Sequence, residues 1–225
     1  MEAYIFDLDY TLVENRAFGY ACRSLPRMLM LEVSGDVFYR EFLNTYYKLV
    51  ASKEYHKAFD WYYVAKRTVE KFGGEMAYDL FLKLFLEGIS RGLVRVIDDA
   101  KSILKHIKSA KNIVVVLTNG YGKYQTPVIK SVGLDKYIDI MFTAEKLPKL
   151  KPHKECFDAV VDFLKKHGAT KVYFIGDNPF FDIYGALNAG IKNIFWITRE
   201  FSEGVYDVRD IANFIERYAL SRYNI

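Results

Sequence analysis

The chain has 225 residues, a length that fits one large domain or a core with an insertion better than a tandem of several folds. Hydrophobic residues make up 51% and charged residues 27%, close to the average of globular proteins, so wholesale disorder is excluded. The formal net charge of +4 is spread along the chain and is not gathered in a tail or a helix stripe. The charge therefore gives no indication of a nucleic-acid partner, and we expect none.

Cysteine usage and hydropathy both indicate a cytoplasmic protein. Cys22 and Cys156 are far apart in the sequence and show no metal-ligand spacing, so neither a disulfide framework nor a zinc site is indicated. The chain has no run of about 18 apolar residues that could cross a membrane, and its first acidic pair comes too early for a signal peptide. We therefore expect a cytoplasmic monomer or homodimer with no membrane partner.

Short apolar runs rich in β-branched and aromatic residues predict strands at 3–8, 113–117, 172–175 and 194–197, with a weaker run at 138–143. Each run is apolar throughout, which is typical of strands that helices cover on both faces. Helical patterns at 99–109, 124–132, 154–167, 182–189 and 207–220 alternate with the later runs. This alternation predicts βαβ units, and hence an α/β fold with a mostly parallel sheet.

The stretch 14–92 interrupts this alternation. It shows helical periodicity and no convincing strand, with helices expected at 36–52, 55–72 and 76–90. We therefore expect a core formed by 1–13 and 93–225 and an all-helical unit, 14–92, inserted after the first strand. Five aromatic residues of the insertion are expected to pack between its helices: Tyr46, Tyr47, Trp61, Tyr62 and Tyr63.

Polar side chains follow the predicted strands. They are Asp7 and Asp9 after the first strand, Thr118 and Asn119 after the second, Lys151 in a loop before the helix at 154–167, and Asp177 and Asp182 after the strand at 172–175. Ligands bind at the carboxyl ends of the strands in open α/β sheets, so these groups are expected to converge on one rim. The sequence thus predicts one site that combines four acidic groups, a hydroxyl and a lysine.

This combination suits phosphoryl transfer, in which a very slow bond must be broken by a nucleophile placed in line with the leaving oxygen. Clustered carboxylates repel an anionic substrate unless a hard cation lies among them, and Mg²⁺ fits such oxygen ligands. Asp7 and Asp177 are the expected ligands, and Asp7 can also attack phosphorus to form an aspartyl-phosphate. Asp9 can protonate the leaving alkoxide and then deprotonate the hydrolytic water.

The remaining polar groups have expected roles around the phosphate. Thr118 and the backbone amides after it, beginning with Asn119, are expected to donate hydrogen bonds to the phosphoryl oxygens. Lys151 is expected to place a positive charge on the same oxygens. Asp182 either completes the metal site or caps the helix that follows it.

These residues resemble the four ordered motifs of the haloacid dehalogenase (HAD) superfamily. The motifs are Asp7-x-Asp9-x-Thr11, Thr118-Asn119, Lys151-Pro152 and Gly176-Asp177-x-x-x-x-Asp182. The resemblance implies a Rossmann-like core, Mg²⁺, Asp7 as nucleophile, Asp9 as acid and base with its backbone carbonyl on the metal, and a helical cap between the first two motifs. Tyr10 stands where members commonly have Gly, so either the turn is altered or an aromatic ring lies near the substrate mouth.

The leading prediction is a Mg²⁺-dependent, HAD-type phosphoric monoester hydrolase that acts on a small cytosolic phosphomonoester through an aspartyl-phosphate. A sugar phosphate, a nucleotide or a phosphoglycolate-like compound would fit as the substrate. A phosphomutase uses the same motifs and is an open alternative. A 2-haloacid dehalogenase needs no acid at Asp9, and a non-catalytic HAD-like binding protein would be expected to have lost Asp7, Asp9 or the fourth motif.

Overall fold

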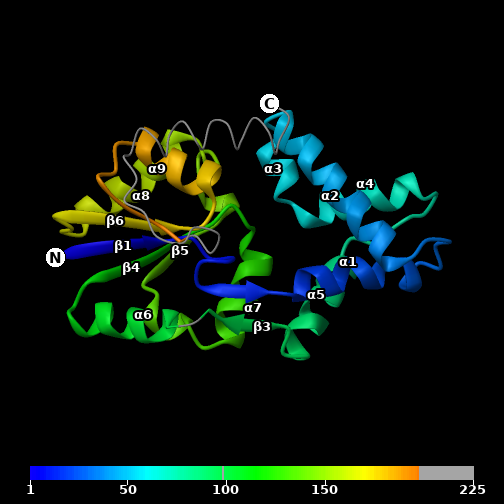
Figure 1. Ribbon diagram of the computed structural model, residues 1–225, viewed down its shortest axis with the longest axis horizontal. Coiled ribbons are helices and arrows are strands. Elements are labelled where there is room, and N and C mark those ends of the chain that lie inside the picture. The colour runs from blue at the N-terminus through cyan, green and yellow to red at the C-terminus, as the bar shows by residue number, and fades with distance from the viewer. Residues whose placement is uncertain (98, 198–225) are drawn as a thin grey trace, which may run out of the picture. The chain divides into compact units, whose positions relative to one another are not determined.

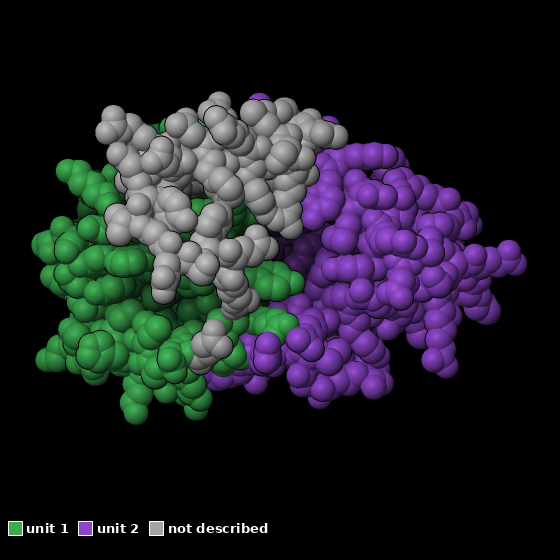
Figure 2. Space-filling view, in the orientation of Figure 1, with its two compact units in different colours: residues 1–14, 96–119, 134–225 green, residues 15–95, 120–133 purple. Residues whose placement is uncertain are grey.

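The computed structural model describes residues 1–97 and 99–197, and Figure 1 shows the order of its helices and strands. The chain divides into two compact units, coloured separately in Figure 2. The first unit comprises Met1–Glu14, Val96–Asn119 and Leu134–Ile225, and the second comprises Asn15–Arg95 and Gly120–Gly133. The assignment of 14–92 as a cap domain stays a prediction.

The first unit is built on a five-stranded sheet in the order β5-β4-β1-β6-β7, and every pair of neighbours is parallel. The strands are β1 (Glu2–Phe6), β4 (Ile113–Leu117), β5 (Ile140–Phe142), β6 (Lys171–Gly176) and β7 (Asn193–Trp196). The central strand, β1, pairs Ile5 with Val115 on one side and with Phe174 on the other. The α/β fold class predicted from the sequence is confirmed.

Helices flank this sheet because its strands are apolar on both faces. In Figure 1, α8 (Lys154–Lys166) and α9 (Gly185–Asn188) lie on one side of the sheet and α6 (Ala100–Ser109) on the other. Phe157 of α8 packs edge-on against Phe174 of β6, with ring centroids 5.4 Å apart, and both rings are fully buried. The polar strand ends are thereby left at the rim of a well-packed layer.

The second unit is mainly helical. Its helices are α1 (Ala17–Met28), α2 (Gly35–Ala51), α3 (Tyr55–Ala58), α4 (Trp61–Lys71), α5 (Leu80–Ser90) and α7 (Gly122–Ser131). Buried aromatic rings hold them together: Tyr124 of α7 lies 4.7 Å from Trp61 of α4 and 5.5 Å from Phe85 of α5, measured between ring centroids. None of the helices in the described residues is long and apolar enough to span a membrane.

Several local predictions differ from the structure. The helix expected at 55–72 is divided into α3 and α4, because Asp60 starts a new helix by accepting a hydrogen bond from the backbone N–H of Tyr62 at 3.2 Å. Helix α1, which contains Gly19 and Pro26, was not expected. Two short strands, β2 (Val13–Asn15) and β3 (Val94–Val96), form a second sheet beside the predicted insertion.

Two further helix predictions have different outcomes. The helix expected at 182–189 begins earlier, as a π-helical turn at Pro179–Tyr184 that leads into α9. The helix expected at 207–220 lies outside the described residues.

Three of the five aromatic residues expected to pack within the insertion contact aromatic rings of the second unit outside this group. Tyr46 packs against Phe59 and Trp61 against Phe85, while Tyr62 packs against Tyr78 at a centroid distance of 4.7 Å. Each of these rings is therefore in contact with another helix or loop of the second unit.

Candidate active site

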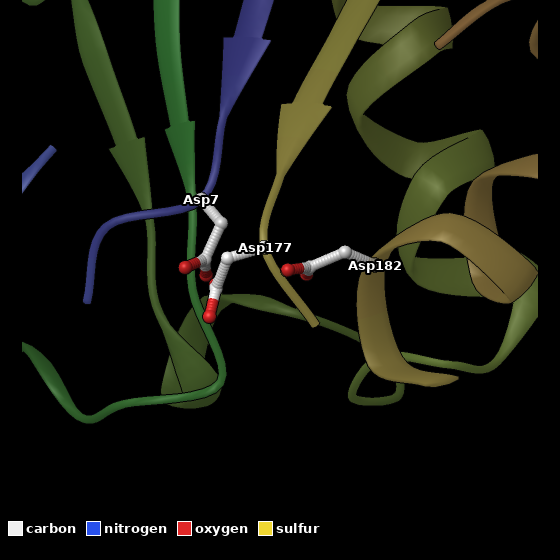
Figure 3. A group of neighbouring side chains, drawn as sticks. All are labelled: Asp7, Asp177 and Asp182. Carbon is white, nitrogen blue, oxygen red and sulfur yellow. The ribbon is translucent and has the colours of Figure 1, made fainter. Parts of the chain in front are cut away.

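Three carboxylates meet at the carboxyl end of the parallel sheet (Figure 3). Asp7 directly follows β1 and Asp177 directly follows β6, and the two strands are neighbours in register, so both side chains emerge at the same edge. The ladder continues to Asp7, whose backbone N–H donates to the carbonyl of Ile175 at 2.9 Å. Asp182 reaches the same point from the π-helical turn, and one oxygen of each carboxylate lies within 4.8 Å of the others.

Lys151 is buried among these carboxylates. Its Nζ lies 2.6 Å from Oδ1 of Asp7 and 2.6 Å from Oδ1 of Asp182, and only 2% of the residue is exposed. Such short contacts between buried, opposite charges are strong because water does not screen them. Lys151 therefore fixes the orientation of two carboxylates at once.

Asn119 holds the backbone that carries Lys151. Its Nδ2 donates to the carbonyl of Lys151 at 2.9 Å, and its Oδ1 accepts from the backbone N–H of Lys151 at 2.8 Å. Asn119 itself follows β4 by two residues, so the amide links the ends of the sheet to the loop that carries Lys151. The side chain of Asn119 is thus occupied by hydrogen bonds to Lys151. The backbone N–H of Asn119 is the group predicted to bind phosphate, and this stays a prediction.

The cluster holds more negative than positive charge. When all three carboxylates are ionised, they face one ammonium group, and two negative charges are left unbalanced. Burial, and to a smaller extent the carboxylate of Asp182, raise the pKa of Asp177 to about 7. Burial likewise raises the pKa of Asp7 well above its usual range, although Lys151 opposes this. Burial works against the charge of Lys151, but its two carboxylate partners outweigh burial and raise its pKa.

These residues fit a divalent cation. The three oxygens are close enough to share one ion, and their unbalanced charge equals that of Mg²⁺. An all-oxygen donor set is also the set that hard cations prefer. Asp7, Asp177 and Asp182 would therefore hold the metal. The resemblance implies that Asp9 contributes its backbone carbonyl and not its carboxylate to the metal, and this ligand stays a prediction.

Asp182 is held in place by its neighbours in the fourth motif. The backbone N–H of Asn178 donates to its Oδ2 at 3.0 Å, and Lys151 holds its other oxygen. A Cβ atom at Gly176 would lie 2.6 Å from Oδ2 of Asp182, so only a glycine leaves room for the carboxylate there. Asn178 caps the π-helical turn by accepting from the N–H groups of Phe180 and Phe181 at 3.0 and 2.9 Å.

The turn after β1 keeps a conformation that usually requires glycine. Tyr10 has a φ of 63°, in the left-handed region, and its backbone N–H donates to the carbonyl of Val13 at 2.7 Å. The residue is 54% exposed. The tyrosine therefore adopts the left-handed backbone conformation that glycine usually occupies, and whether its ring lies near the substrate stays a prediction.

Two residues of the site had no role in the sequence analysis. Thr11, the last residue of the first motif, donates from Oγ1 to Oδ1 of Asp177 at 3.3 Å. Trp196, at the end of β7, donates from Nε1 to the backbone carbonyl of Asp177 at 2.9 Å. The motif could have suggested Thr11, whereas nothing in the pattern of the sequence indicates the contact of Trp196.

Thr118, expected to bind phosphate, lies at the rim where the motifs predict it. It directly follows β4, is buried, and donates its backbone N–H to the carbonyl of Phe142 at 3.0 Å. Asp9 lies three residues beyond the end of β1, is half-buried, and forms a β-bridge with Val13. The roles of Thr118 and Asp9 in the reaction stay predictions.

Comparison with known proteins agrees with this geometry. The family model described as haloacid dehalogenase-like hydrolase matches residues 4–196. A glyceraldehyde 3-phosphate phosphatase of Pyrococcus furiosus is 22% identical over 225 residues, which cover 96% of this chain and 88% of that protein. The pyrimidine 5'-nucleotidase YjjG of Escherichia coli is 30% identical over 109 residues, which span about half of each protein, 47% of this chain and 48% of that one.

Among solved structures, a HAD phosphatase from Thermococcus onnurineus superposes with a TM-score of 0.65 at 21% identity, covering 97% of this chain and 98% of that one. This likeness shows the fold. The predicted enzyme class, a phosphoric monoester hydrolase of HAD type, agrees with the family match and with these relatives. Because the family model covers most of the sequence, the chain belongs to the haloacid dehalogenase-like hydrolase family.

Proposed function

We propose that the protein is a Mg²⁺-dependent phosphatase that hydrolyses a small phosphomonoester in the cytoplasm through an aspartyl-phosphate on Asp7. The observation that carries the proposal is the buried cluster in which Lys151 holds Asp7 beside Asp177 and Asp182. A carboxylate at a strand end, oriented by a lysine and placed where a divalent cation fits, suits nucleophilic attack on phosphorus.

Asp7, Asp9 and Lys151 have separate roles in the two chemical steps of the proposed reaction. In the first step an oxygen of Asp7 bonds to phosphorus, the bond from phosphorus to the leaving oxygen breaks, and Asp9 gives its proton to the departing alkoxide. In the second step Asp9 takes a proton from water, the water oxygen bonds to phosphorus, and the bond from phosphorus to the oxygen of Asp7 breaks. This step releases inorganic phosphate and regenerates the carboxylate of Asp7. Lys151 keeps the carboxylate of Asp7 in one orientation through both steps.

Mg²⁺ bound by Asp7, Asp177 and Asp182 would supply the positive charge that lets an anionic phosphate approach these carboxylates. The raised pKa of Asp7 supports this requirement, because burial, and to a smaller extent the carboxylates of Asp182 and Asp177, disfavour the ionised nucleophile when no cation is bound. Thr118 and the backbone N–H of Asn119 are proposed to donate hydrogen bonds to the phosphoryl oxygens.

The proposed substrates are small sugar phosphates and nucleotides. The names of two relatives, a glyceraldehyde 3-phosphate phosphatase and a pyrimidine 5'-nucleotidase, support this choice. A phosphoglycolate-like compound belongs in the same test panel. A phosphomutase would use the same residues, and it differs in transferring the phosphoryl group to a second hydroxyl of the substrate in place of water.

The proposal is tested by phosphate release from an aryl phosphate and from a panel of sugar phosphates and nucleoside monophosphates. We expect release with Mg²⁺, none with excess EDTA, and loss of all turnover in Asp7→Asn. Asp162→Asn, which changes an exposed aspartate of α8, is the matched control and should keep full activity. Acid-quenched wild-type enzyme should gain the mass of one phosphoryl group, and Asp7→Asn should not.

Three outcomes would contradict the proposal. Full activity in EDTA would show that the reaction needs no metal. Activity of Asp7→Asn above about one hundredth of the wild-type value would show that Asp7 is not the nucleophile. Conversion of a sugar phosphate to its isomer without release of inorganic phosphate would show a phosphomutase.

A further inference from the structure

One peptide group beside the acidic cluster is held at both of its polar atoms. It joins Asp177 to Asn178. Its carbonyl oxygen accepts from Nε1 of Trp196 at 2.9 Å, and its N–H donates to Oδ2 of Asp182 at 3.0 Å. A strand residue and a carboxylate of the cluster therefore fix the plane of this peptide together.

Trp196 reaches this peptide because of where the strand ladder ends. Gly176 is the last residue of β6 and lies opposite Trp196, the last residue of β7. The backbone N–H of Ile197 still donates to the carbonyl of Gly176, at 2.8 Å. The next carbonyl along the chain is that of Asp177, and here the indole of Trp196 supplies the donor. The side chain thus extends the hydrogen bonding of the sheet by one residue into the loop of the fourth motif.

The direction of the Asp177 side chain depends on this peptide. Its carboxylate starts from the Cα atom next to the held carbonyl, so rotation of the peptide would swing the carboxylate relative to Asp7 and Asp182. The Asp177 carboxylate also accepts from Oγ1 of Thr11, at the longer distance of 3.3 Å. Groups that orient ligands in this way influence metal affinity strongly.

We infer that Trp196 is a positioning residue for the metal site: its indole N–H holds the Asp177–Asn178 peptide and so places the carboxylates of Asp177 and Asp182 for Mg²⁺. The inference rests on the metal site of the proposed function. It adds a residue outside the four motifs, 14 positions beyond Asp182 in the sequence.

A purely structural role of Trp196 predicts something different. If the indole mattered only as an apolar plug at the sheet edge, phenylalanine would replace it with little effect on metal binding. If its N–H matters, phenylalanine should keep the packing and lose metal affinity. Trp196→Phe therefore separates the two roles, and histidine, which has a ring N–H, should restore part of the affinity.

The test is calorimetric titration of the protein with MgCl₂, which requires no turnover. We expect the Kd for Mg²⁺ to rise about ten-fold in Trp196→Phe, less in Trp196→His, and not at all in Trp61→Phe. Trp61 is the only other tryptophan of the chain, so Trp61→Phe is a matched control. Thermal unfolding in EDTA should differ little between wild type and Trp196→Phe.

The control variant gives a second measurement. In Trp61→Phe the indole of Trp196 is the only tryptophan fluorophore, and its emission should change as Mg²⁺ saturates the neighbouring carboxylates. This reading is made on a protein with Trp196 intact, so it does not depend on the folding of a Trp196 variant.

The outcomes separate this inference from the proposed function. An unchanged Kd for Mg²⁺ in Trp196→Phe, or no change of Trp196 emission when Mg²⁺ binds, would overturn the positioning role and leave the metal site intact. Wild-type protein that binds no Mg²⁺ would overturn the metal site and the positioning role together. A protein that binds Mg²⁺ as expected but releases no phosphate would contradict the proposed reaction and support the role of Trp196.

Discussion

The side-chain amide of Asn119 forms hydrogen bonds with both polar backbone atoms of Lys151. Its Nδ2 lies 2.9 Å from the carbonyl oxygen, and its Oδ1 lies 2.8 Å from the backbone nitrogen. Both partners are buried, and the lysine in turn holds two carboxylates of the site. The side chain of Asn119, in the second motif, therefore holds the backbone of Lys151, in the third motif, in addition to any contact of the second motif with phosphate.

Removal of this amide should lower both activity and stability. In Asn119→Ala the buried N–H and carbonyl of Lys151 lose these partners, which costs about 2 kcal/mol or more in the free energy of unfolding. Displacement of Lys151 should also lower kcat about ten- to a hundred-fold. Thermal unfolding and steady-state kinetics check this. Asn44→Ala, which removes an exposed asparagine bonded to Glu41, is the control; equal behaviour of the two variants would refute the role of Asn119.

The metal-free protein should lose stability as the pH rises. The pKa of Asp177 is raised to about 7 by burial and by Asp182, so the folded chain retains a proton that the unfolded chain has already released. The free energy of unfolding then falls between about pH 4 and about pH 7, by a few kcal/mol at most. Thermal unfolding in EDTA across this range, compared with Asp177→Asn, isolates the contribution, because the variant lacks this titration.

Mg²⁺ should reverse this loss of stability at higher pH. An ion among the carboxylates stabilises their charged forms, so the gain in Tm on adding Mg²⁺ should be larger at pH 8 than at about pH 5. A gain that does not depend on pH would show that Asp177 does not titrate in this window.

Gly176→Ala should impair metal binding. The new Cβ atom would lie 2.6 Å from Oδ2 and 2.7 Å from Cγ of Asp182, a carboxylate that Lys151 and Asn178 already hold. We expect the Kd for Mg²⁺ to rise about ten-fold or more, as measured by calorimetry. Gly133→Ala is a useful comparison, because its backbone is left-handed but the space around it is open. It should cost about 1 kcal/mol of stability and leave the Kd unchanged.

Tyr10→Gly should stabilise the fold. The left-handed backbone of Tyr10, with φ 63°, costs a residue with a side chain about 1–2 kcal/mol, part of which glycine returns through greater freedom in the unfolded chain. We expect a net gain of up to about 1 kcal/mol in the free energy of unfolding, measured with denaturant. Lys53→Gly, at φ 59° in the second unit, should gain a similar amount. A loss of stability in Tyr10→Gly alone would show that the tyrosine ring makes contacts that outweigh the backbone strain.

The sequence predicted the parts of the site that follow from strand order. Asp7 and Asp177 come directly after apolar runs, and parallel neighbouring strands place such residues at one edge of the sheet, so the sequence alone predicts that they meet. The lysine could be assigned to the same rim, but its two carboxylate partners could not, because Lys151 lies in a loop whose path no periodic pattern describes.

Other features of the structure depend on distances between atoms, which the pattern of residues in the sequence does not predict. The sequence places Trp196 within a predicted strand. Only the register of β6 against β7 shows that its indole reaches the carbonyl of Asp177. The resemblance marked position 10 as one where members commonly have Gly, but a tyrosine does not itself predict the left-handed backbone that Tyr10 adopts. The break between α3 and α4 did have a signal, the helix-capping residue Asp60, which the continuous helical periodicity of 55–72 concealed.

The division of the chain has a consequence for the order in which the protein can fold during synthesis. Helix α7 belongs to the helical unit but is encoded after β4, and its Tyr124 completes the contacts of Trp61 and Phe85. A ribosome that has made only the residues up to 95 has therefore produced a helical unit whose aromatic interior is still open. That unit can close only once α7 has been synthesised, when β1 and β4 of the parallel sheet have been made but β5, β6 and β7 have not. A fragment ending after α5 would expose the rings that Tyr124 normally covers.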